Sequence, residues 1–130
     1  MGEPTIVGVF VSDVEATLTF YALLGFAFTR EDPQHCHLRS PNGMQIMIND
    51  ERLAPRMGVR EPFTAGGRTS LGIRCATAAE VDEIYTRCAE EGFGAVAPFD
   101  APWGHRYATV RDPDGSRVDL YAVLPAGPDH

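Results

Sequence analysis

The sequence has 130 residues, 44% of them hydrophobic, and its 11 Lys and Arg stand against 18 Asp and Glu for a net charge of −7. An acidic chain lacks the basic face that nucleic-acid binding requires, so we expect no DNA or RNA partner; the charge is compatible with a cationic or neutral small ligand. No apolar run approaches the roughly 20 residues of a membrane span, and no basic segment precedes an apolar one at the N-terminus. We therefore expect a cytoplasmic protein of one domain with no membrane association. The odd number of cysteines, without metal-type spacing, predicts buried or partly buried free thiols in a reducing compartment.

The first predicted elements are a strand and a helix. Residues 5–11 are β-branched and apolar, which favours a strand. Ser12 and Glu15 then have the spacing of a helix capping box. Apolar residues follow at helical spacing as far as Gly25, where we expect the helix to end.

Three further strands complete the first half of the chain. Residues 26–28 resume extended structure, and residues 35–39 and 44–48 flank a turn at Pro41-Asn42-Gly43. The pattern predicts a βαβββ module over about residues 4–50.

Residues 51–68 have no clear periodicity. The segment is rich in proline, glycine and arginine, and a connection of this length is usually functional or disordered. We interpret it as the linker between two halves of the chain. Phe63 within it is a candidate lid over a ligand, or a loosely packed surface side chain.

The second half of the chain repeats the first. Residues 69–75 predict a strand, Thr77 and Glu80 have capping-box spacing, and helical periodicity continues to Gly92. Residues 94–99 are again extended.

A hairpin closes this second module. Residues 107–111 and 118–122 alternate in polarity on either side of the turn Asp112-Pro113-Asp114-Gly115. The module spans about residues 69–124 and leaves a tail at 125–130. The repeat predicts an α+β fold in a single domain of residues 1–130, with two βαβββ modules, mixed β-sheets that form cups, and helices on the outside.

Period-2 alternation assigns the two faces of each sheet. Val7, Val9 and Val11 should pack under a helix, which leaves the other residues of the strand on the opposite face. The same rule places a set of polar and aromatic side chains on the faces away from the helices: Ile6, Phe10, His35, His37, Gln45, Met47, Asn49, Tyr107, Thr109, Arg117, Asp119 and Tyr121.

Two signatures resemble the vicinal oxygen chelate superfamily, which includes glyoxalase I, bleomycin-resistance proteins and extradiol dioxygenases. They are the segments Val9–Asp13 with Phe20–Phe26, and the turn Asp112–Gly115 followed by Arg117–Tyr121. The resemblance implies paired βαβββ modules with cupped sheets, a homodimer, and ligand sites in the cups.

Enzymes of this superfamily hold a divalent metal through inward residues of the first and last strand of each module. The corresponding positions here are Ile6, Met47, Ser70 (or its neighbour Leu71) and Asp119. Isoleucine and methionine do not ligate a hard or borderline cation, and serine is a poor ligand. We therefore expect no metal and no other cofactor. The alternative is an unorthodox site that recruits His35, His37 or His105.

A metal-free subset of the superfamily binds antibiotics, and two segments resemble its mitomycin-resistance type: Trp103–Ala108 and Asp112–Leu120. The resemblance implies that Trp103, together with His35 or its neighbour His37, stacks on a planar drug. The other candidate contacts are Phe10, Met47, Phe63, Tyr107, Asp119 and Tyr121. Asp119 has a second interpretation, as the structural partner of a nearby arginine such as Arg106.

Three functions remain open at this point. The first is a metal-independent protein that binds and sequesters a planar, antibiotic-like small molecule and so confers drug resistance. The second is a metal-dependent lyase, isomerase or dioxygenase of the glyoxalase type, and the third is an accessory protein that carries a natural-product intermediate. No residues resemble a nucleophile–base pair, a phosphate loop or a redox motif, so no catalytic residues are expected.

Overall fold

A computed structural model describes residues 1–125 of the chain. It divides into two compact units, Met1–Pro62 and Phe63–His130. The division falls inside the segment that the sequence indicated as a linker. Of the predicted tail, residues 126–130 lie outside the described residues.

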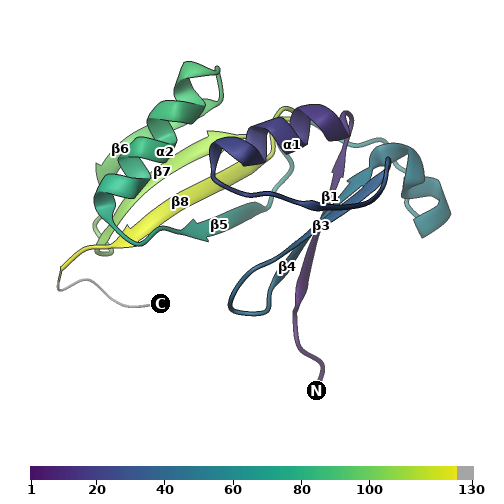
Figure 1. Cartoon of the computed structure of the whole chain (residues 1–130), viewed down its shortest axis with the longest axis horizontal. Helices are drawn as coiled ribbons and strands as arrows, with labels where there is room; N and C mark the ends of the chain where they lie inside the picture. Colours follow the sequence, from purple (N-terminus) through teal and green to yellow (C-terminus); the bar gives the residue numbers. More distant parts are fainter. Residues whose placement is uncertain (126–130) are drawn as a thin grey trace. The chain divides into compact units, whose positions relative to one another are not determined.

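The first unit is one four-stranded sheet with one α-helix. The strand order is β1-β4-β3-β2, with β1 parallel to β4 and the other neighbours antiparallel. Figure 1 labels β1, β3 and β4 of this sheet. The elements in chain order are β1 (Ile6–Val11), α1 (Val14–Leu23), β2 (Thr29–Asp32), β3 (His35–Arg39), β4 (Gln45–Asp50) and the 3-10 helix η1 (Glu51–Met57).

The second unit has the same topology, with the order β5-β8-β7-β6 and a single parallel pair, β5 and β8. Its elements are β5 (Ser70–Arg74), α2 (Ala78–Glu90), β6 (Gly94–Asp100), β7 (His105–Arg111) and β8 (Arg117–Val123). The predicted α+β fold of two βαβββ modules with mixed sheets is confirmed.

The two helix starts differ from each other. Thr77 caps α2 as predicted, because its side chain accepts a hydrogen bond from the Glu80 backbone N–H at 3.1 Å. At α1 the prediction of Ser12 was wrong by one residue: Asp13 is the cap, and its carboxylate accepts from the Ala16 N–H at 3.1 Å. Aspartate caps a helix about as well as serine, so spacing alone did not distinguish the two residues.

Residues 26–28 form no strand, contrary to the prediction. β2 begins only at Thr29. The Phe26 and Phe28 rings instead pack on Tyr21 of α1, with ring centroids 6.4 Å and 5.3 Å from the tyrosine ring. Burial against the helix therefore fixes this segment in place of strand pairing.

The predicted linker begins with regular structure. The side chain of Asp50 caps η1 by accepting from the Arg52 N–H at 3.0 Å, and Gly58 ends the helix at a φ of 87°. A left-handed backbone of this kind favours glycine. The periodicity of a seven-residue 3-10 helix is too short to stand out in the sequence.

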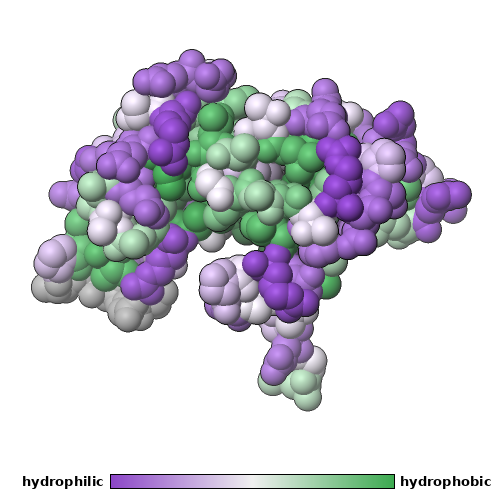
Figure 2. All heavy atoms as spheres, viewed as in Figure 1, coloured by the Kyte–Doolittle hydropathy of each residue, from purple (hydrophilic) through white to green (hydrophobic). Residues whose placement is uncertain are grey.

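One face of the second sheet forms an apolar core with α2. Val81, Ile84 and Cys88 of the helix are buried, as are Val118 and Leu120 of the central strand β8. Hydrophilic side chains cover the outer side of α2, at the upper left of Figure 2. The alternation along β8 therefore separates a core face from a second, polar face, as the sequence predicted. No helix within residues 1–125 is long and apolar enough to span a membrane.

All three cysteines are free and buried, which gives a first testable expectation. Burial raises the pKa of the Cys75 and Cys88 thiols to about 11 and also raises that of Cys36. Because the thiolate is the reactive species, we expect almost no reaction with a disulfide reagent at pH 8 in the native protein and three equivalents in guanidinium chloride. Rapid native labelling of one thiol would contradict this placement.

Candidate small-molecule binding site

The polar face of the second sheet is built by cross-strand pairs of β7 and β8. Tyr107 lies opposite Tyr121, Thr109 opposite Asp119, and Arg111 opposite Arg117. These side chains point away from the face that packs on α2, because successive residues of a strand alternate between faces. The two predicted site residues Asp119 and Tyr107 thus share one surface.

Asp119 is the centre of a hydrogen-bond network on this surface. It is 7% exposed, and its Oδ1 accepts from Thr109 Oγ1 at 2.8 Å and from Arg117 Nε at 2.7 Å. Burial on its own would raise the pKa of this carboxyl, but hydrogen bonds from Tyr107, Arg117, Thr109 and Ser70 outweigh burial and lower it. Asp119 is therefore an ionised, preorganised carboxylate.

Asp119 does pair with a nearby arginine, as its second interpretation expected, but that arginine is Arg117 and the choice of Arg106 was wrong. Arg106 lies on the opposite face of β7 and donates to Asp82 of α2 at 2.9 Å and to Asp100 at 3.2 Å. Arg117 takes the predicted place beside Asp119. The reason is the two-residue period of the strand, which turns Arg106 towards the helix.

An aromatic group borders the Asp119 network. Trp103 is 46% exposed and packs edge-to-face on Tyr107, with centroids 5.5 Å apart. Phe99 of β6 contacts the same tyrosine at 6.0 Å. Tyr107 is itself hydrogen-bonded to Asp119 and Arg117, and burial raises the pKa of its phenol. Exposed aromatic faces and a charged network are therefore continuous on one surface.

Tyr121 lies on the same sheet face and stacks on the buried His105, with ring centroids 5.0 Å apart. The structure thus brings four of the predicted contacts onto one surface of the second unit: Trp103, Tyr107, Asp119 and Tyr121.

A pocket of about 420 Å³ opens beside the Asp119 network. The loop before β5 closes one side, since a Cβ on Gly66 would lie 3.5 Å from the Gly115 carbonyl oxygen of the β7–β8 turn. Both glycines have positive φ, which favours residues without a side chain at this close approach. The lining residues are Gly66, Gly67, Arg68, Thr69, Ser70, Arg111, Arg117 and Asp119.

Sequence reasoning missed the arginines of this pocket. Arg117 was placed on the correct face, but neither it nor Arg68 and Arg111 was considered as a ligand contact. The alternation along 107–111 already put Arg111 on the same face as Tyr107. Arg68 had no such signal, because it lies in the aperiodic segment.

Phe63 is 46% exposed in the segment before β5. It is not among the residues that line the pocket. Its role as a lid stays a prediction.

The remaining predicted contacts belong to the first unit. His35 Nδ1 lies 2.6 Å from Asn49 Oδ1, and Asn49 also pairs with Phe10 across β1 and β4. His37 pairs with Met47 and lies 2.8 Å from the Glu31 carboxylate. The predicted sharing of one sheet face by these residues agrees with the observed register.

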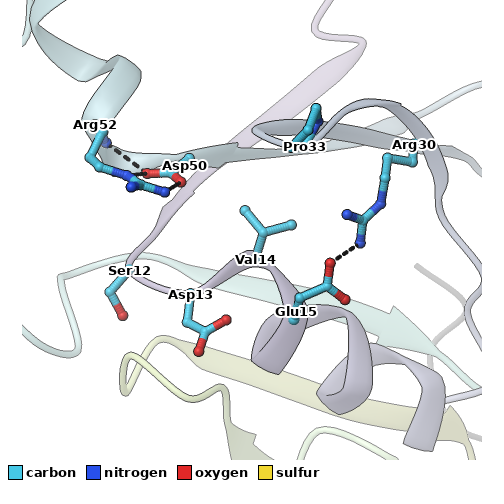
Figure 3. Close-up of a pocket in the computed structure, with 8 residues that line it drawn as sticks. All are labelled: Ser12, Asp13, Val14, Glu15, Arg30, Pro33, Asp50 and Arg52. Carbon is cyan, nitrogen blue, oxygen red and sulfur yellow. Dashed lines mark hydrogen bonds and ion pairs between the residues drawn. The ribbon is translucent and has the colours of Figure 1, made fainter.

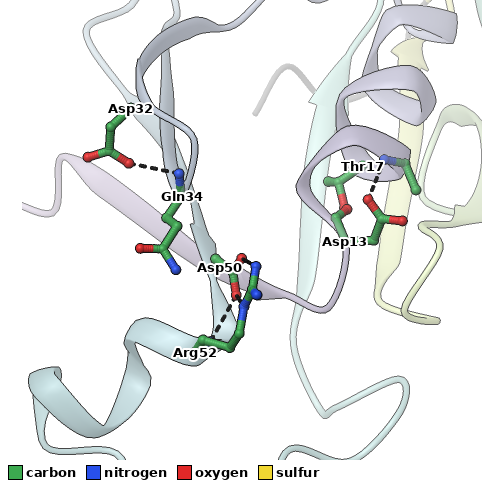
Figure 4. A network of polar contacts seen from close by, with 7 residues as sticks. Asp13, Thr17, Asp32, Gln34, Asp50 and Arg52 are labelled. Atoms are coloured by element: carbon green, nitrogen blue, oxygen red, sulfur yellow. Dashed lines mark hydrogen bonds and ion pairs between the residues drawn. The ribbon is translucent and has the colours of Figure 1, made fainter.

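The first unit has a second pocket, of about 300 Å³, in which both arginines are paired with carboxylates (Figure 3). Arg30 pairs with Glu15, and Arg52 Nε donates to Asp50 at 2.9 Å. Hydrogen bonds from the Arg52 side chain lower the pKa of Asp50 to about 2. Figure 4 shows this ion pair together with Asp32, whose side chain accepts a hydrogen bond from the backbone N–H of Gln34. We interpret the pocket as structural because both arginines are bound in ion pairs and the third carboxylate, that of Asp13, caps α1.

The residues at the superfamily's metal positions do not fit a cation. Ile6 pairs with Gln45 across the parallel strands, and Ser70 pairs with Arg117, whose charge would repel a metal ion. Asp119 is already bound by that guanidinium. Among residues 1–125 no group of three or more His, Cys, Asp or Glu is arranged to hold a metal.

The chain matches the sequence profile of the Glyoxalase/Bleomycin resistance protein/Dioxygenase superfamily over residues 5–120. It belongs to this superfamily. No curated protein sequence matches it.

Solved structures of this superfamily show the same fold at low identity. A glyoxalase/bleomycin resistance protein/dioxygenase family enzyme from Burkholderia phytofirmans is 21% identical, with 95% of this chain and 100% of that one covered and a TM-score of 0.83. A glyoxalase-related enzyme from Fulvimarina pelagi is also 21% identical, with coverage of 94% and 88% and a TM-score of 0.82. A lactoylglutathione lyase from Agrobacterium tumefaciens is 20% identical, with coverage of 91% of both chains and a TM-score of 0.70. At these identities the likeness concerns the fold alone.

Proposed function

We propose that this superfamily member is a metal-independent binding protein for a planar small molecule, held on the polar face of the second sheet around Trp103. The observation that carries the proposal is the half-exposed Trp103 ring, which packs edge-to-face on Tyr107, a residue hydrogen-bonded to Asp119 and Arg117 of the pocket. A rigid aromatic wall next to a few preorganised polar groups is the usual composition of a small-molecule site. The segment around Trp103 resembles that of mitomycin-resistance proteins, which supports the sequestration of a drug as the biological role of this binding site.

Glyoxalase-type catalysis is the rival function, and one similar structure is a lactoylglutathione lyase. The residues at the superfamily's metal positions argue against glyoxalase-type catalysis in this protein. Ile6 and Ser70 stand at two of these positions, and Asp119 at another is bound to Arg117. Under the binding proposal the ligand leaves the protein chemically unchanged.

The proposal is tested with a neutral planar probe, 2-naphthamide. Calorimetry should show saturable binding with one site per chain, and the emission of the only tryptophan should change in parallel. Mass spectrometry should recover the probe unaltered. No heat and no emission change at millimolar probe would overturn the proposal.

Metal content separates the two functions independently of any ligand. We expect far less than one equivalent of zinc, iron, manganese or nickel per chain in elemental analysis of protein purified without chelator. The reason is the poor donor set at Ile6, Met47 and Ser70. One equivalent of a divalent metal that also alters the emission of Trp103 on removal would support the glyoxalase-type alternative.

We also propose that the protein is a homodimer. Exposed apolar side chains lie on both β1 and β6, each at an edge of its sheet: Ile6, Val96 and Phe99. Exposed apolar edges are surfaces that natural proteins usually cover. Analytical ultracentrifugation at micromolar concentration should give twice the mass of the chain, and a stable monomer would contradict the proposal.

A further inference from the structure

We infer that the pocket beside β5 and β8 binds an oxyanion, a carboxylate or a phosphate, carried by the planar ligand. This inference rests on the proposed function, because it names the charged group of the same ligand. It differs from the expectation of a cationic or neutral compound that the overall charge of the chain favoured. The local charge of the pocket is opposite to that of the protein.

The pocket carries an excess of positive charge. Three arginines line the pocket, against the single carboxylate of Asp119, in a chain whose net charge is −7. Asp119 is bound to one of them, Arg117. Arg111 donates only to a backbone carbonyl, that of Gly115 at 2.8 Å, and Arg68 has no carboxylate partner within residues 1–125. Two positive charges of the pocket are thus left without a counter-charge.

Two of the three positive charges are neighbours on the sheet. Arg111 and Arg117 lie directly opposite each other in the antiparallel ladder of β7 and β8. Like charges at such a pair repel and destabilise the sheet. An anion between them would relieve that repulsion, and guanidinium groups bind carboxylate and phosphate oxygens in a bidentate manner.

Tyr107 connects the arginine pocket to the aromatic group around Trp103. Tyr107 contacts the Trp103 ring on one side and is hydrogen-bonded to Arg117 and Asp119 on the other. A planar ligand on Trp103 that extends past Tyr107 would therefore reach Arg117 and Asp119 of the pocket. A flat ring that carries an acidic substituent fits this arrangement, with the ring on Trp103 and the acidic group at the arginines of the pocket.

The test compares three probes that share one ring: 2-naphthoate, 2-naphthamide and 2-naphthylmethylammonium. At low ionic strength we expect calorimetry to show naphthoate binding about 5- to 20-fold more tightly than the amide, with the ammonium compound weakest. Arg68→Gln and Arg111→Gln should each weaken naphthoate binding by about 3- to 10-fold and leave amide binding unchanged. Arg87→Gln, on the exposed side of α2, removes the same charge outside the pocket and is the matched control.

Inorganic phosphate tests the anion pocket without the ring. Phosphate should shift the amide resonances of Gly66 and Gly67, and Arg68→Gln should reduce these shifts. Phosphate shifts without binding of any naphthyl probe would sustain the oxyanion pocket and refute the planar-ligand function. Equal affinity for amide and naphthoate, with no phosphate shifts, would refute the oxyanion pocket and leave the planar-ligand function standing.

Discussion

Trp103→Ala should weaken the binding of 2-naphthamide by about 1–3 kcal/mol, which corresponds to roughly 5- to 150-fold in Kd. The ring offers a half-exposed face that is held by Tyr107, so its removal takes away both apolar contact area and stacking. Trp103→Phe should keep part of the affinity, because a smaller aromatic face remains. Binding is measured by calorimetry, since the variant lacks the only fluorescent tryptophan.

The same variant should change the stability of the fold little, by about 1 kcal/mol or less in the free energy of unfolding. Trp103 lies in the turn between β6 and β7 and is not part of the core that α2 covers. Met57→Ala removes another exposed apolar side chain, at the end of η1, and should affect neither binding nor stability. A sharp loss of melting temperature in Trp103→Ala with unchanged affinity would identify Trp103 as a core residue and place the ligand elsewhere.

Leu120→Ala should have the opposite effect: it should lower the stability of the fold and leave ligand binding nearly unchanged. Leu120 is fully buried on the core face of β8, where it lies opposite Ile73 of β5 on one side and Ala108 of β7 on the other. Truncation to alanine leaves a cavity and should cost about 2–5 kcal/mol of stability. Thermal unfolding followed by Trp103 emission reports on the second unit directly.

Below its melting transition, Leu120→Ala should bind 2-naphthamide nearly as well as the unmodified protein. The neighbour of Leu120 in sequence, Asp119, faces the other side of the sheet and keeps its network. A loss of affinity equal to that of Trp103→Ala, measured well below the melting transition, would show that the two faces are not independent.

Local patterns in the sequence were sufficient for the fold. Matched helix stops at Gly25 and Gly92 and the turn at Asp112–Gly115 each depend on neighbouring residues, so their signal is readable without the tertiary structure. Where local chemistry allowed two answers, as between Ser12 and Asp13 at the start of α1, the sequence predicted the element and missed its first residue.

The site was predictable only in part, for a physical reason. Alternation along β7 and β8 is a local property, so the sequence by itself determined that Tyr107 and Asp119 share a face with Arg117. Arg117, the arginine partner of Asp119, lies only two residues away on the same strand, whereas the approach of Arg68 depends on an aperiodic loop that packs against Gly115. Only the tertiary structure decided this approach, because it arises from packing between segments far apart in sequence. The positive pocket in an acidic chain is its consequence: net charge is a sum over all residues, whereas a ligand senses the few charges within a Debye length of it.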